Sequence, residues 1–315
     1  MRVVVVGAGI CGLVAGRRLV EAGADVVLVD KGRSPGGRLA TRRIGTATVD
    51  HGAQFFTVRT PAFRRQVDDW VERGLVGVWS HGFTSDDGHP RYVAMSGMNS
   101  LAKDLAVGLD VRCSTMAFGI RPAASDSGAA WEVAIDDGTA HEADAVIVTT
   151  PLPQAFALLA DSGIHLDQGL MRTEYDRTIA LLVTLDRAPA IADPGGLQGP
   201  APELSFISDN VAKGVSDTPA ITVHASAAWS EAHWDDDADM LRTALIDLIG
   251  PWLGHATVIE AQVKKWRFAT PRTSWPEPCW IANGGAVVLA GDAFDGPRVE
   301  AAHNSGLAAA HAIVS

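Results

Sequence analysis

The sequence predicts an α/β protein, in which a doubly wound parallel sheet is accompanied by a second domain of the α+β type with an antiparallel sheet. Three observations lead to this fold class. A strand-turn-helix-strand pattern opens the chain in residues 1–30, longer alternating strands occupy 156–266, and a strand, a turn and a helix fill 286–314. Because parallel strands need crossover helices, the first and last segments fit a parallel sheet, and the middle segment fits an antiparallel one.

The first thirty residues predict a βαβ unit that holds a dinucleotide. Residues 3–6 form a buried strand, 13–22 a helix, and 26–29 a second strand that ends at Asp30. In the connecting turn, Gly7 allows the tight bend, Gly9 lets backbone N–H groups approach a pyrophosphate, and Gly12 lets helix and strand pack closely. Asp30 stands where a ribose-binding carboxylate belongs. The alternative, a glycine-rich turn without a ligand, does not explain this acid.

Length and composition fit a globular protein. With 315 residues and 47% hydrophobic content, the chain can form one large or two moderate domains, each with its own core. We find no run long enough for a membrane span and no targeting segment at the start, so we expect a cytoplasmic protein. Cys11, Cys113 and Cys279 are scattered without a C-x-x-C motif, so we expect neither a disulfide framework nor a metal.

Charge is spread unevenly along the chain. The net charge of −11 argues against nucleic acid as a partner. Residues 31–65, however, hold eight Lys or Arg against one acid, Asp50, which gives a local charge of +7. We expect roughly half of these cations to be solvated, as charged residues usually are, and the others to face phosphates. The eight are Lys31, Arg33, Arg38, Arg42, Arg43, Arg59, Arg64 and Arg65.

Two helices are predicted between the βαβ unit and residue 110. A glycine-rich connection at 32–37 precedes them. The first is an amphipathic helix at 61–75, and the second follows residues 96–99 and ends near 107. Apolar residues line one face of the first helix, namely Phe63, Val67, Trp70, Val71 and Leu75.

Short strands come next. We predict strands at 110–113, 131–135 and 140–143, with Asp136-Asp137-Gly138 as the hairpin turn between the last two. Residues 145–149 are apolar and β-branched and end before Pro151, so they are expected to return to the parallel sheet.

Residues 156–266 predict an antiparallel sheet with a helical cover. Its strands are expected at 179–185, 204–207, 220–225 and 258–263, its helix at 238–249 and a loop at 189–202. A last buried strand at 286–290, followed by Gly291-Asp292 and a helix at 298–314, returns to the first domain. We therefore predict a discontinuous nucleotide-binding domain of residues 1–57, 91–155 and 267–315, and a substrate domain of residues 58–90 and 156–266.

Four features together resemble FAD-dependent oxidases of the glutathione-reductase-like flavoprotein superfamily, in its amine oxidase branch. They are the turn at 7–12, Gly36-Gly37-Arg38, the segment 50–56, and the Gly291-Asp292 strand-helix unit. Within this branch the chain is similar to renalase-like enzymes. That similarity runs nearly from end to end and is carried by residues 36–43, 50–56, 223–225, 265–267 and 291–294.

The resemblance implies an FAD cofactor bound without a covalent link. Asp30 would accept hydrogen bonds from the adenosine ribose, Arg38 would lie near the pyrophosphate or flavin edge, and Asp292 near the ribityl chain or pyrophosphate. The start of the last helix would direct N–H groups at the flavin pyrimidine ring and stabilise negative charge on the reduced flavin. The implied cofactor-binding residues are Gly7, Gly9, Ile10, Cys11, Gly12, Asp30, Lys31, Gly37, Arg38, His51, Gly52, Ala53, Gln54, Phe55, Gly291, Asp292, Arg298, Val299 and Glu300.

A reaction is implied as well. Renalase-like enzymes oxidise the 2- and 6-dihydro isomers of NAD(P)H to NAD(P)⁺ by hydride transfer to flavin N5, and O₂ is reduced to H₂O₂. This reaction needs a flat apolar slot more than a strong base. Phe55 and Phe56 would be ring walls, His224 a polar handle, and Trp266 or Trp280 a further face. The catalytic candidates are Phe55, His224 and Trp266, and the partners a dihydronicotinamide dinucleotide and O₂, without nucleic acid or membrane.

Other interpretations stay open. The first is an amine oxidase or another desaturase, although the chain has only Tyr92 and Tyr175 for the tyrosine cage that amine oxidases commonly use. His224 and Trp266 are alternatively core residues, and Gln54 alternatively satisfies backbone groups. A flavin-binding redox sensor without turnover belongs to another class of function, and an NAD-dependent dehydrogenase does not require the Gly291-Asp292 unit. The exact substrate, isomer preference, electron acceptor and oligomeric state also stay open.

Overall fold

The computed structural model describes residues 1–83, 87–124, 128–282 and 284–315. Positions 84–86, 125–127 and 283, which fall inside the predicted domain ranges, lie outside the described residues. The chain divides into two compact units. Unit 1 comprises Met1–Gly37, Leu101–Glu174 and Pro271–Ser315, and unit 2 comprises Arg38–Ser100 and Tyr175–Thr270. Within the described ranges, no helix is both long enough and apolar enough to pass through a bilayer.

Unit 1 is built on a six-stranded sheet with the strand order β17-β18-β11-β1-β2-β7. Its strands are β1 (Arg2–Val6), β2 (Asp25–Asp30), β7 (Asp110–Cys113), β11 (Ala145–Val148), β18 (Val287–Leu289) and β17 (Trp280–Ile281). All neighbours pair in parallel except β17, which is antiparallel to β18. The β-branched run Val3–Val6 is at most 4% exposed, as expected of a parallel strand covered on both faces.

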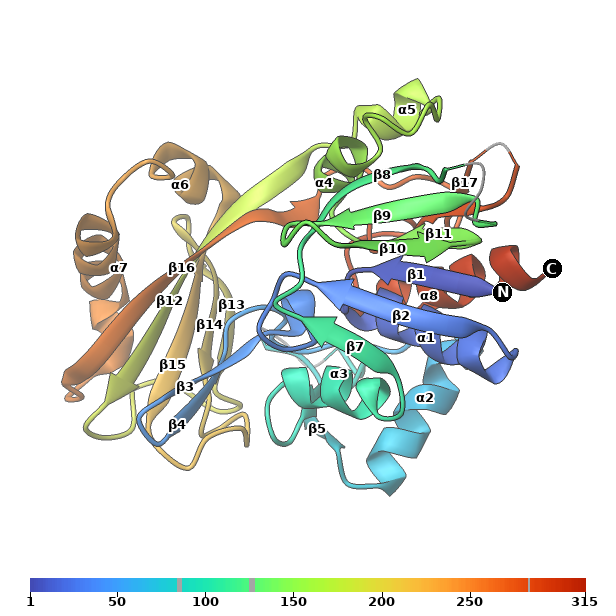
Figure 1. Ribbon diagram of the computed structural model, residues 1–315. Helices are drawn as coiled ribbons and strands as arrows, with labels where there is room; N and C mark the ends of the chain where they lie inside the picture. The colour runs from blue at the N-terminus through green and yellow to red at the C-terminus, as the bar shows by residue number, and fades with distance from the viewer. Residues whose placement is uncertain (84–86, 125–127, 283) are drawn as a thin grey trace. The chain divides into compact units, whose positions relative to one another are not determined.

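Both faces of this sheet are covered. Helices α1 (Ile10–Glu21) and α8 (Val299–Val314) pack together behind it in Figure 1, and a three-stranded sheet lies in front. That second sheet has the order β10-β9-β8, formed by β8 (Ala117–Pro122), β9 (Trp131–Ile135) and β10 (Ala140–Ala143). Unit 1 also contains α4 (Leu152–Leu158) and α5 (Gln168–Met171), and α3 (Asn99–Ala106) spans its boundary with unit 2.

Unit 2 is built on a five-stranded sheet with the order β13-β14-β15-β12-β16. The strands are β12 (Tyr175–Leu185), β13 (Gly196–Ala201), β14 (Leu204–Asp209), β15 (Ala220–Ala225) and β16 (Val258–Pro271). Strand β15 pairs with β12 and β14, and β14 pairs with β13, all in antiparallel orientation. Together with unit 1, this confirms the predicted fold class, a doubly wound parallel sheet and a second α+β domain with an antiparallel sheet.

The two faces of the unit 2 sheet differ. Helices α6 (Ala227–Ala232) and α7 (Ala238–Leu253) belong to one face, where Leu241, Leu245 and Ile249 complete an apolar core with the strands (Figure 1). The other face receives a hairpin of β3 (Thr41–Ile44) and β4 (Ala47–Asp50), whose apolar residues pack on Leu182 and Ala220. Because side chains alternate along a strand, each strand contributes to both faces.

A smaller part of unit 2 consists of α2 (Pro61–Glu72) and a hairpin of β5 (Val76–Ser80) and β6 (Arg91–Ala94). The Thr60 side chain accepts from the N–H of Phe63 and caps α2. Phe63, Val67 and Trp70 are buried as predicted, but the helix ends at Glu72 rather than 75. Val71, which was predicted on the same apolar face, is 45% exposed and does not lie with the three buried residues.

Several elements depart from the sequence expectations. The predicted loop at 189–202 contains β13, an edge strand whose Gly and Pro residues and irregular register hide the strand pattern. Strand β8 was also missed, because a register shift after Ala117 breaks its alternation and Phe118 is exposed. Strands β12 and β16 extend well beyond the predicted 179–185 and 258–263.

The compact units differ from the predicted domain ranges at their boundaries. Residues 38–57 and 91–100 belong to unit 2, because the β3–β4 hairpin packs on the antiparallel sheet and β6 pairs with β5. Residues 156–174 belong to unit 1, where the carbonyl of Glu174 accepts from the N–H of Arg272.

Candidate functional site

Four parallel strands of unit 1 end at the same level. Val6 of β1 lies opposite Val148 of β11 and Val29 of β2, and Val148 lies opposite Leu289 of β18. The residues that follow these strands therefore share one edge of the sheet, which we call the carboxyl edge. In open α/β sheets, ligands bind outside this edge.

The turn after β1 forms an anion-binding helix start. Gly9 is the N-cap of α1 and has no side chain to cap it, and the first intrahelical bond runs from the N–H of Leu13 to the Gly9 carbonyl at 3.0 Å. The N–H groups of Ile10, Cys11 and Gly12 thus have no acceptor within the helix. At the positive end of a helix dipole, such groups suit a pyrophosphate.

Backbone conformation and steric constraints require glycine at positions 7 and 12 of this turn. Gly7 has a φ of +109°, and a Cβ at Gly12 would lie 2.0 Å from the Gly7 carbonyl oxygen. A Cβ at Gly9 would meet no atom within 4 Å, so open space borders the turn there. A second glycine segment packs against it, since the N–H of Gly36 donates to the Ala8 carbonyl at 2.9 Å and Gly37 lies beside Gly9.

Asp30 holds these two turns in place. Its Oδ2 accepts from the N–H of Ala8 at 2.7 Å and its Oδ1 from the N–H of Gly32 at 2.6 Å. A carboxylate has about four lone-pair sites, so two bonds leave capacity for a ribose hydroxyl. The ribose contact of Asp30 remains a prediction, and the structure adds a bracing role. Lys31, directly after it, is exposed at the same edge.

The last strand and helix complete the carboxyl edge. The N–H of Gly291 donates to Ser305 Oγ at 2.8 Å, and Asp292 beside it is 9% exposed. Helix α8 begins after its N-cap Arg298, which makes no side-chain cap, so the N–H groups of Val299 and Glu300 lack intrahelical acceptors. A Cβ at Gly306 would lie 2.3 Å from the Cys11 carbonyl oxygen, so α8 packs closely on the first turn of α1.

Two orphaned polar atoms test whether unit 1 fits a bound dinucleotide. Thr150 Oγ1, just after β11, and Arg298 Nε, just before α8, are buried and have no hydrogen-bond partner among the described residues. Buried polar groups without partners are rare in folded proteins. Both flank the carboxyl edge, so the residues there fit a ligand that supplies hydrogen-bonding groups.

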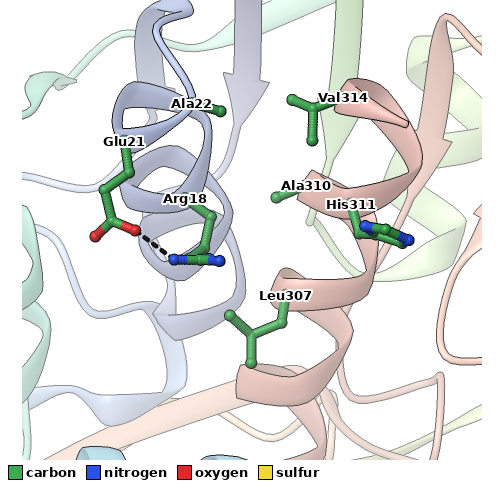
Figure 2. Close-up of a pocket in the computed structure, with 7 residues that line it drawn as sticks. All are labelled: Arg18, Glu21, Ala22, Leu307, Ala310, His311 and Val314. Carbon is green, nitrogen blue, oxygen red and sulfur yellow. Dashed lines mark hydrogen bonds and ion pairs between the residues drawn. The ribbon is translucent and has the colours of Figure 1, made fainter.

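A groove of about 320 Å³ also lies between α1 and α8. Figure 2 shows Arg18 bonded to Glu21 on one side and Leu307, Ala310 and Val314 on the other. These residues belong to the later turns of both helices. Because both helices start near the carboxyl edge, the groove lies away from it and is not part of the proposed cofactor site.

In unit 2, the segment after β4 meets the sheet at a cluster of rings. The carbonyl of His51 accepts hydrogen bonds from Trp266 Nε1 at 2.8 Å and from His224 Nε2 at 3.3 Å. The His51 ring also stacks on Trp266 with 5.4 Å between centroids. The structure therefore brings together three of the sequence-predicted residues, which we call the His51 cluster.

The histidines of this cluster are neutral at physiological pH. Burial lowers the pKa of His51 from 6.5 to about 4, with help from the nearby charges of Lys264 and Arg42. Burial likewise lowers the pKa of His224 to about 4. Since a carbonyl oxygen only accepts, His224 carries its proton on Nε2. His51 Nδ1 is buried without a partner among the described residues, so a ligand could bond it.

Phe55 and Phe56, both predicted as ring walls, belong to different aromatic groups. Phe55 packs with Phe83 and Phe206, at 5.1 and 5.8 Å between ring centroids. Phe206 on β14 lies directly opposite His224 on the neighbouring strand β15. Phe55 thus belongs to an aromatic group beside the His51 cluster. Phe56 instead is buried against Phe63, Trp70 and Tyr92 under α2, so its prediction as a ring wall was wrong. Trp280 lies on the edge strand β17 of unit 1.

Gln54 is committed to its own protein. Its Nε2 donates to the carbonyls of Asp50 and Gly52, and its Oε1 accepts from Ser208 Oγ and Lys213 Nζ. Both amide hydrogens and both lone pairs are thereby used. The Gln54 side chain therefore matches the alternative interpretation, in which it satisfies backbone groups. Any contact of Gln54 with the flavin would have to come from its backbone.

Three other predicted cofactor-binding residues, Arg38, Gly52 and Ala53, make contacts within unit 2. The N–H of Ala53 donates to the Arg38 carbonyl at 2.8 Å, and a Cβ at Gly52 would lie 2.0 Å from that same oxygen. Arg38 Nη1 donates to the carbonyl of Ala269 on β16 at 3.1 Å. Cofactor contacts by Arg38, His51, Gly52 and Ala53 remain predictions.

Sequence reasoning missed Lys213. Its Nζ lies 2.8 Å from Asp50 Oδ2, and both side chains are 0% exposed. Asp50 had been noted as the single acid of the basic stretch and as the first residue of the segment 50–56. Neither observation indicated its partner, because nothing in the spacing links residue 50 to residue 213.

Comparisons with known proteins agree with this arrangement. The family of flavin containing amine oxidoreductases matches residues 71–314, and NAD(P)-binding Rossmann-like domains match residues 5–70. Renalase from Mus musculus is 30% identical over 173 residues, 51% of this chain and 50% of renalase. Hydroxyneurosporene desaturase from Rubrivivax gelatinosus is 50% identical over 58 residues, 18% of this chain and 11% of the desaturase. The chain thus spans half or less of the length of either relative.

Solved structures share the fold over the whole length. A putative protoporphyrinogen oxidase from Exiguobacterium sp. 255-15 has a TM-score of 0.74 at 15% identity, covering 99% of this chain and 98% of that one. Putrescine oxidase has a TM-score of 0.73 at 15% identity, covering 100% and 99%. At such identity these two show the fold alone. With its family match over residues 71–314, the chain belongs to the flavin-containing amine oxidoreductases, a family of FAD-dependent oxidoreductases, and its cofactor is FAD.

Proposed function

We propose that the protein oxidises the 2- and 6-dihydro isomers of NAD(P)H to NAD(P)⁺ with O₂ as the acceptor. The observation that carries this proposal is the His51 cluster, an uncharged aromatic surface flanked by cationic side chains. When bound, FAD supplies the two-electron chemistry, so that substrate, O₂ and one proton give NAD(P)⁺ and H₂O₂.

The cluster suits a flat, neutral ring. Stacked His51 and Trp266 offer an aromatic surface, and the unpartnered His51 Nδ1 offers one hydrogen-bonding site to a group such as a carboxamide. A dihydropyridine becomes aromatic when it loses hydride, so it needs orientation rather than deprotonation. The low pKa of both histidines fits this role, because such groups are weak bases at neutral pH.

The surrounding charge suits a substrate with phosphates. Lys264 and Arg42 lie close enough to His51 to lower its pKa, so the site has a positive potential. This potential attracts a pyrophosphate and disfavours a protonated amine. The tyrosines do not form an amine cage with the cluster, since Tyr92 is buried with its hydroxyl accepting from Arg64, and Tyr175 packs edge-on against Phe268.

Anaerobic mixing of the purified protein with each substrate class tests the proposal. We expect the 2- or 6-dihydro isomers to remove the visible absorbance of the flavin quickly, and a panel of amines to leave it unchanged. Rapid loss of absorbance with an amine alone would establish the amine oxidase alternative. No loss with any compound would favour a redox sensor.

A matched pair of variants connects this result to the cluster. Trp266→Phe keeps a ring but removes the N–H that bonds the His51 carbonyl, so it should slow flavin reduction. Trp229→Phe makes the same change at a tryptophan that stacks on His233, and should leave the rate unchanged. Equal rates in both variants would remove the cluster from the substrate site.

A further inference from the structure

Lys213 is surrounded by partners that occupy its whole ammonium group. Its Nζ lies 2.8 Å from Asp50 Oδ2, 3.3 Å from Gln54 Oε1 and 5.6 Å from the centroid of the Trp79 ring. A lysine has three N–H donors, and the carboxylate, the amide oxygen and the aromatic face provide three directions of interaction. The charge is therefore compensated locally, inside a site without solvent access.

Asp50 connects this lysine to several other segments of unit 2. Its Oδ1 accepts from the N–H of Met98 and from Thr41 Oγ1, while its backbone carbonyl accepts from Thr222 Oγ1 at 2.7 Å and from Gln54 Nε2 at 2.9 Å. Because Gln54 also binds Lys213, both ends of the segment 50–54 are attached to the same ammonium group. We call this segment the Asp50 loop.

Stability alone is a weak reason to retain such an ion pair. Removing two charges from water is costly, and well-packed apolar residues often replace a buried ion pair without loss of stability. A fully bonded pair does, however, select one backbone conformation, because an alternative would leave a charge unpaired. The residue that this conformation presents next to Asp50 is His51, whose carbonyl bonds Trp266 and His224.

We propose that Lys213 and Asp50 are positioning residues, whose buried ion pair fixes the Asp50 loop so that the His51 carbonyl accepts from both Trp266 and His224. Only the kinetic part of its test rests on the function proposed above. Among the hydrogen bonds of the described residues, none joins the pair to the Trp266 or His224 ring, so the pair acts on the His51 carbonyl through the backbone of residues 50 and 51. The Lys213 charge also acts on His224 through space. Loss of the pair should free that backbone, turn the His51 carbonyl away, and leave the Trp266 indole without its acceptor.

Three variants separate positioning from stability. Lys213→Met and Asp50→Asn each leave one buried charge without its partner, so both should lower the melting temperature. The double variant Asp50→Asn with Lys213→Met contains no buried charge and should recover most of the melting temperature. It should not recover the conformation of the Asp50 loop, because the ammonium group that joins the side chains of residues 50 and 54 is gone and only the bond from Gln54 Nε2 to the residue 50 carbonyl remains.

The Trp266 indole N–H reports on that conformation in ¹⁵N-edited NMR spectra of the holoprotein, with Trp266→Phe identifying its signal. In the double variant we expect the signal to move toward the position of a solvent-bonded indole and kcat/KM to fall by up to about 100-fold. Thr222→Val removes one hydrogen bond from the Asp50 carbonyl and should move the signal less, in the same direction. The exposed ion pair of Asp239 and Arg242 on α7, replaced by Asn and Met, is the control and should change neither reading.

A double variant with the native indole signal and native kcat/KM would overturn the proposal and leave the pair a structural role. If the double variant does not fold, Thr222→Val decides, and a native signal there has the same meaning. Should no dihydronicotinamide reduce the wild-type flavin, the proposed function fails. The indole signal still tests Lys213 in that case, since it requires no substrate.

Discussion

Two loops of this protein are held in place by opposite means. The turn at 7–12 in unit 1 is made of backbone, since its shape depends on the φ of Gly7 and on the missing Cβ of Gly12. The Asp50 loop in unit 2 is held by side chains from distant segments, namely Lys213, Thr222 and Ser208. The first places the start of helix α1 at the carboxyl edge, where the N–H groups of its first turn have no acceptor within the helix. The second uses the Asp50 and Gln54 side chains for bonds within unit 2. The comparison teaches that an added side-chain atom should disrupt the turn, whereas the loss of a buried charge should disrupt the Asp50 loop.

The largest effect should come from steric change in the turn. Gly12→Ala places a Cβ 2.0 Å from the Gly7 carbonyl oxygen, so the turn cannot close and FAD binding should be lost. Visible absorbance of the purified protein measures this. Gly9→Ala is the control, because its Cβ meets no protein atom within 4 Å. It should fold normally and bind FAD more weakly, through a clash with the pyrophosphate alone. A Gly12→Ala protein with a full complement of flavin would contradict the comparison.

The second largest effect should come from removing one charge of the buried pair of Lys213 and Asp50. Lys213→Met or Asp50→Asn leaves one charge buried and unpaired, which should lower the free energy of unfolding by roughly 3–5 kcal/mol. The double variant should lose much less. Urea unfolding measures all three. If the double variant is as unstable as either single one, packing rather than charge holds the loop.

The neutral histidines should make unit 2 sensitive to acid. The pKa of His224 is lowered from 6.5 to about 4 in the fold, so between these pH values the unfolded chain binds a proton that the folded chain does not. Stability is complete above pH 6.5 and falls as the pH is lowered toward 4, by roughly 3 kcal/mol for this residue. His51 should act in the same direction. The free energy of unfolding, measured across this pH range, should fall less for His224→Gln, which keeps a donor for the His51 carbonyl. An identical decline in the variant would show that His224 is not buried and neutral.

The smallest effect should come from the cations around the cluster. Arg42→Gln should raise KM for a dinucleotide substrate by about fivefold or less and leave kcat unchanged, since Arg42 is only half-buried and charges that water still reaches act weakly. The effect should shrink as salt is added. Arg65→Gln removes the same charge from the exposed surface of α2 and should leave KM unchanged. Salt-independent effects in Arg42→Gln would point to a direct structural role instead.

The same comparison explains what could be predicted from sequence. The turn at 7–12, Asp30 and the strand-helix unit at Gly291-Asp292 depend on local spacing, so the fold class and the first unit were predictable. Strand β13 was not, because its glycines and its bulge resemble a loop. The predicted domain range 1–57 extends beyond the start of unit 2 at Arg38, because the β3–β4 hairpin follows the cofactor turn in sequence and packs with the antiparallel sheet in space.

Within the candidate site, several single residues were predictable from sequence, but the hydrogen bonds that connect them were not. His51, His224 and Trp266 were all singled out, yet nothing in the sequence showed that one carbonyl oxygen of His51 bonds the other two. Gln54 and Asp50 stand in a recognisable segment, but their partner Lys213 lies 163 residues from Asp50 in an ordinary polar loop. Contacts over such separations are set by the packing of the whole sheet.

The proposed function is tested most directly with a dihydronicotinamide carrying deuterium at the carbon that loses hydride, mixed anaerobically with the holoprotein. With both hydrogens at that carbon replaced by deuterium, the proposal predicts that the flavin absorbance disappears more slowly than with the unlabelled isomer, and that the NAD(P)⁺ formed keeps one of the two deuterium atoms. Identical rates with the labelled and unlabelled isomers, or reduction of the flavin only by amines, would contradict it.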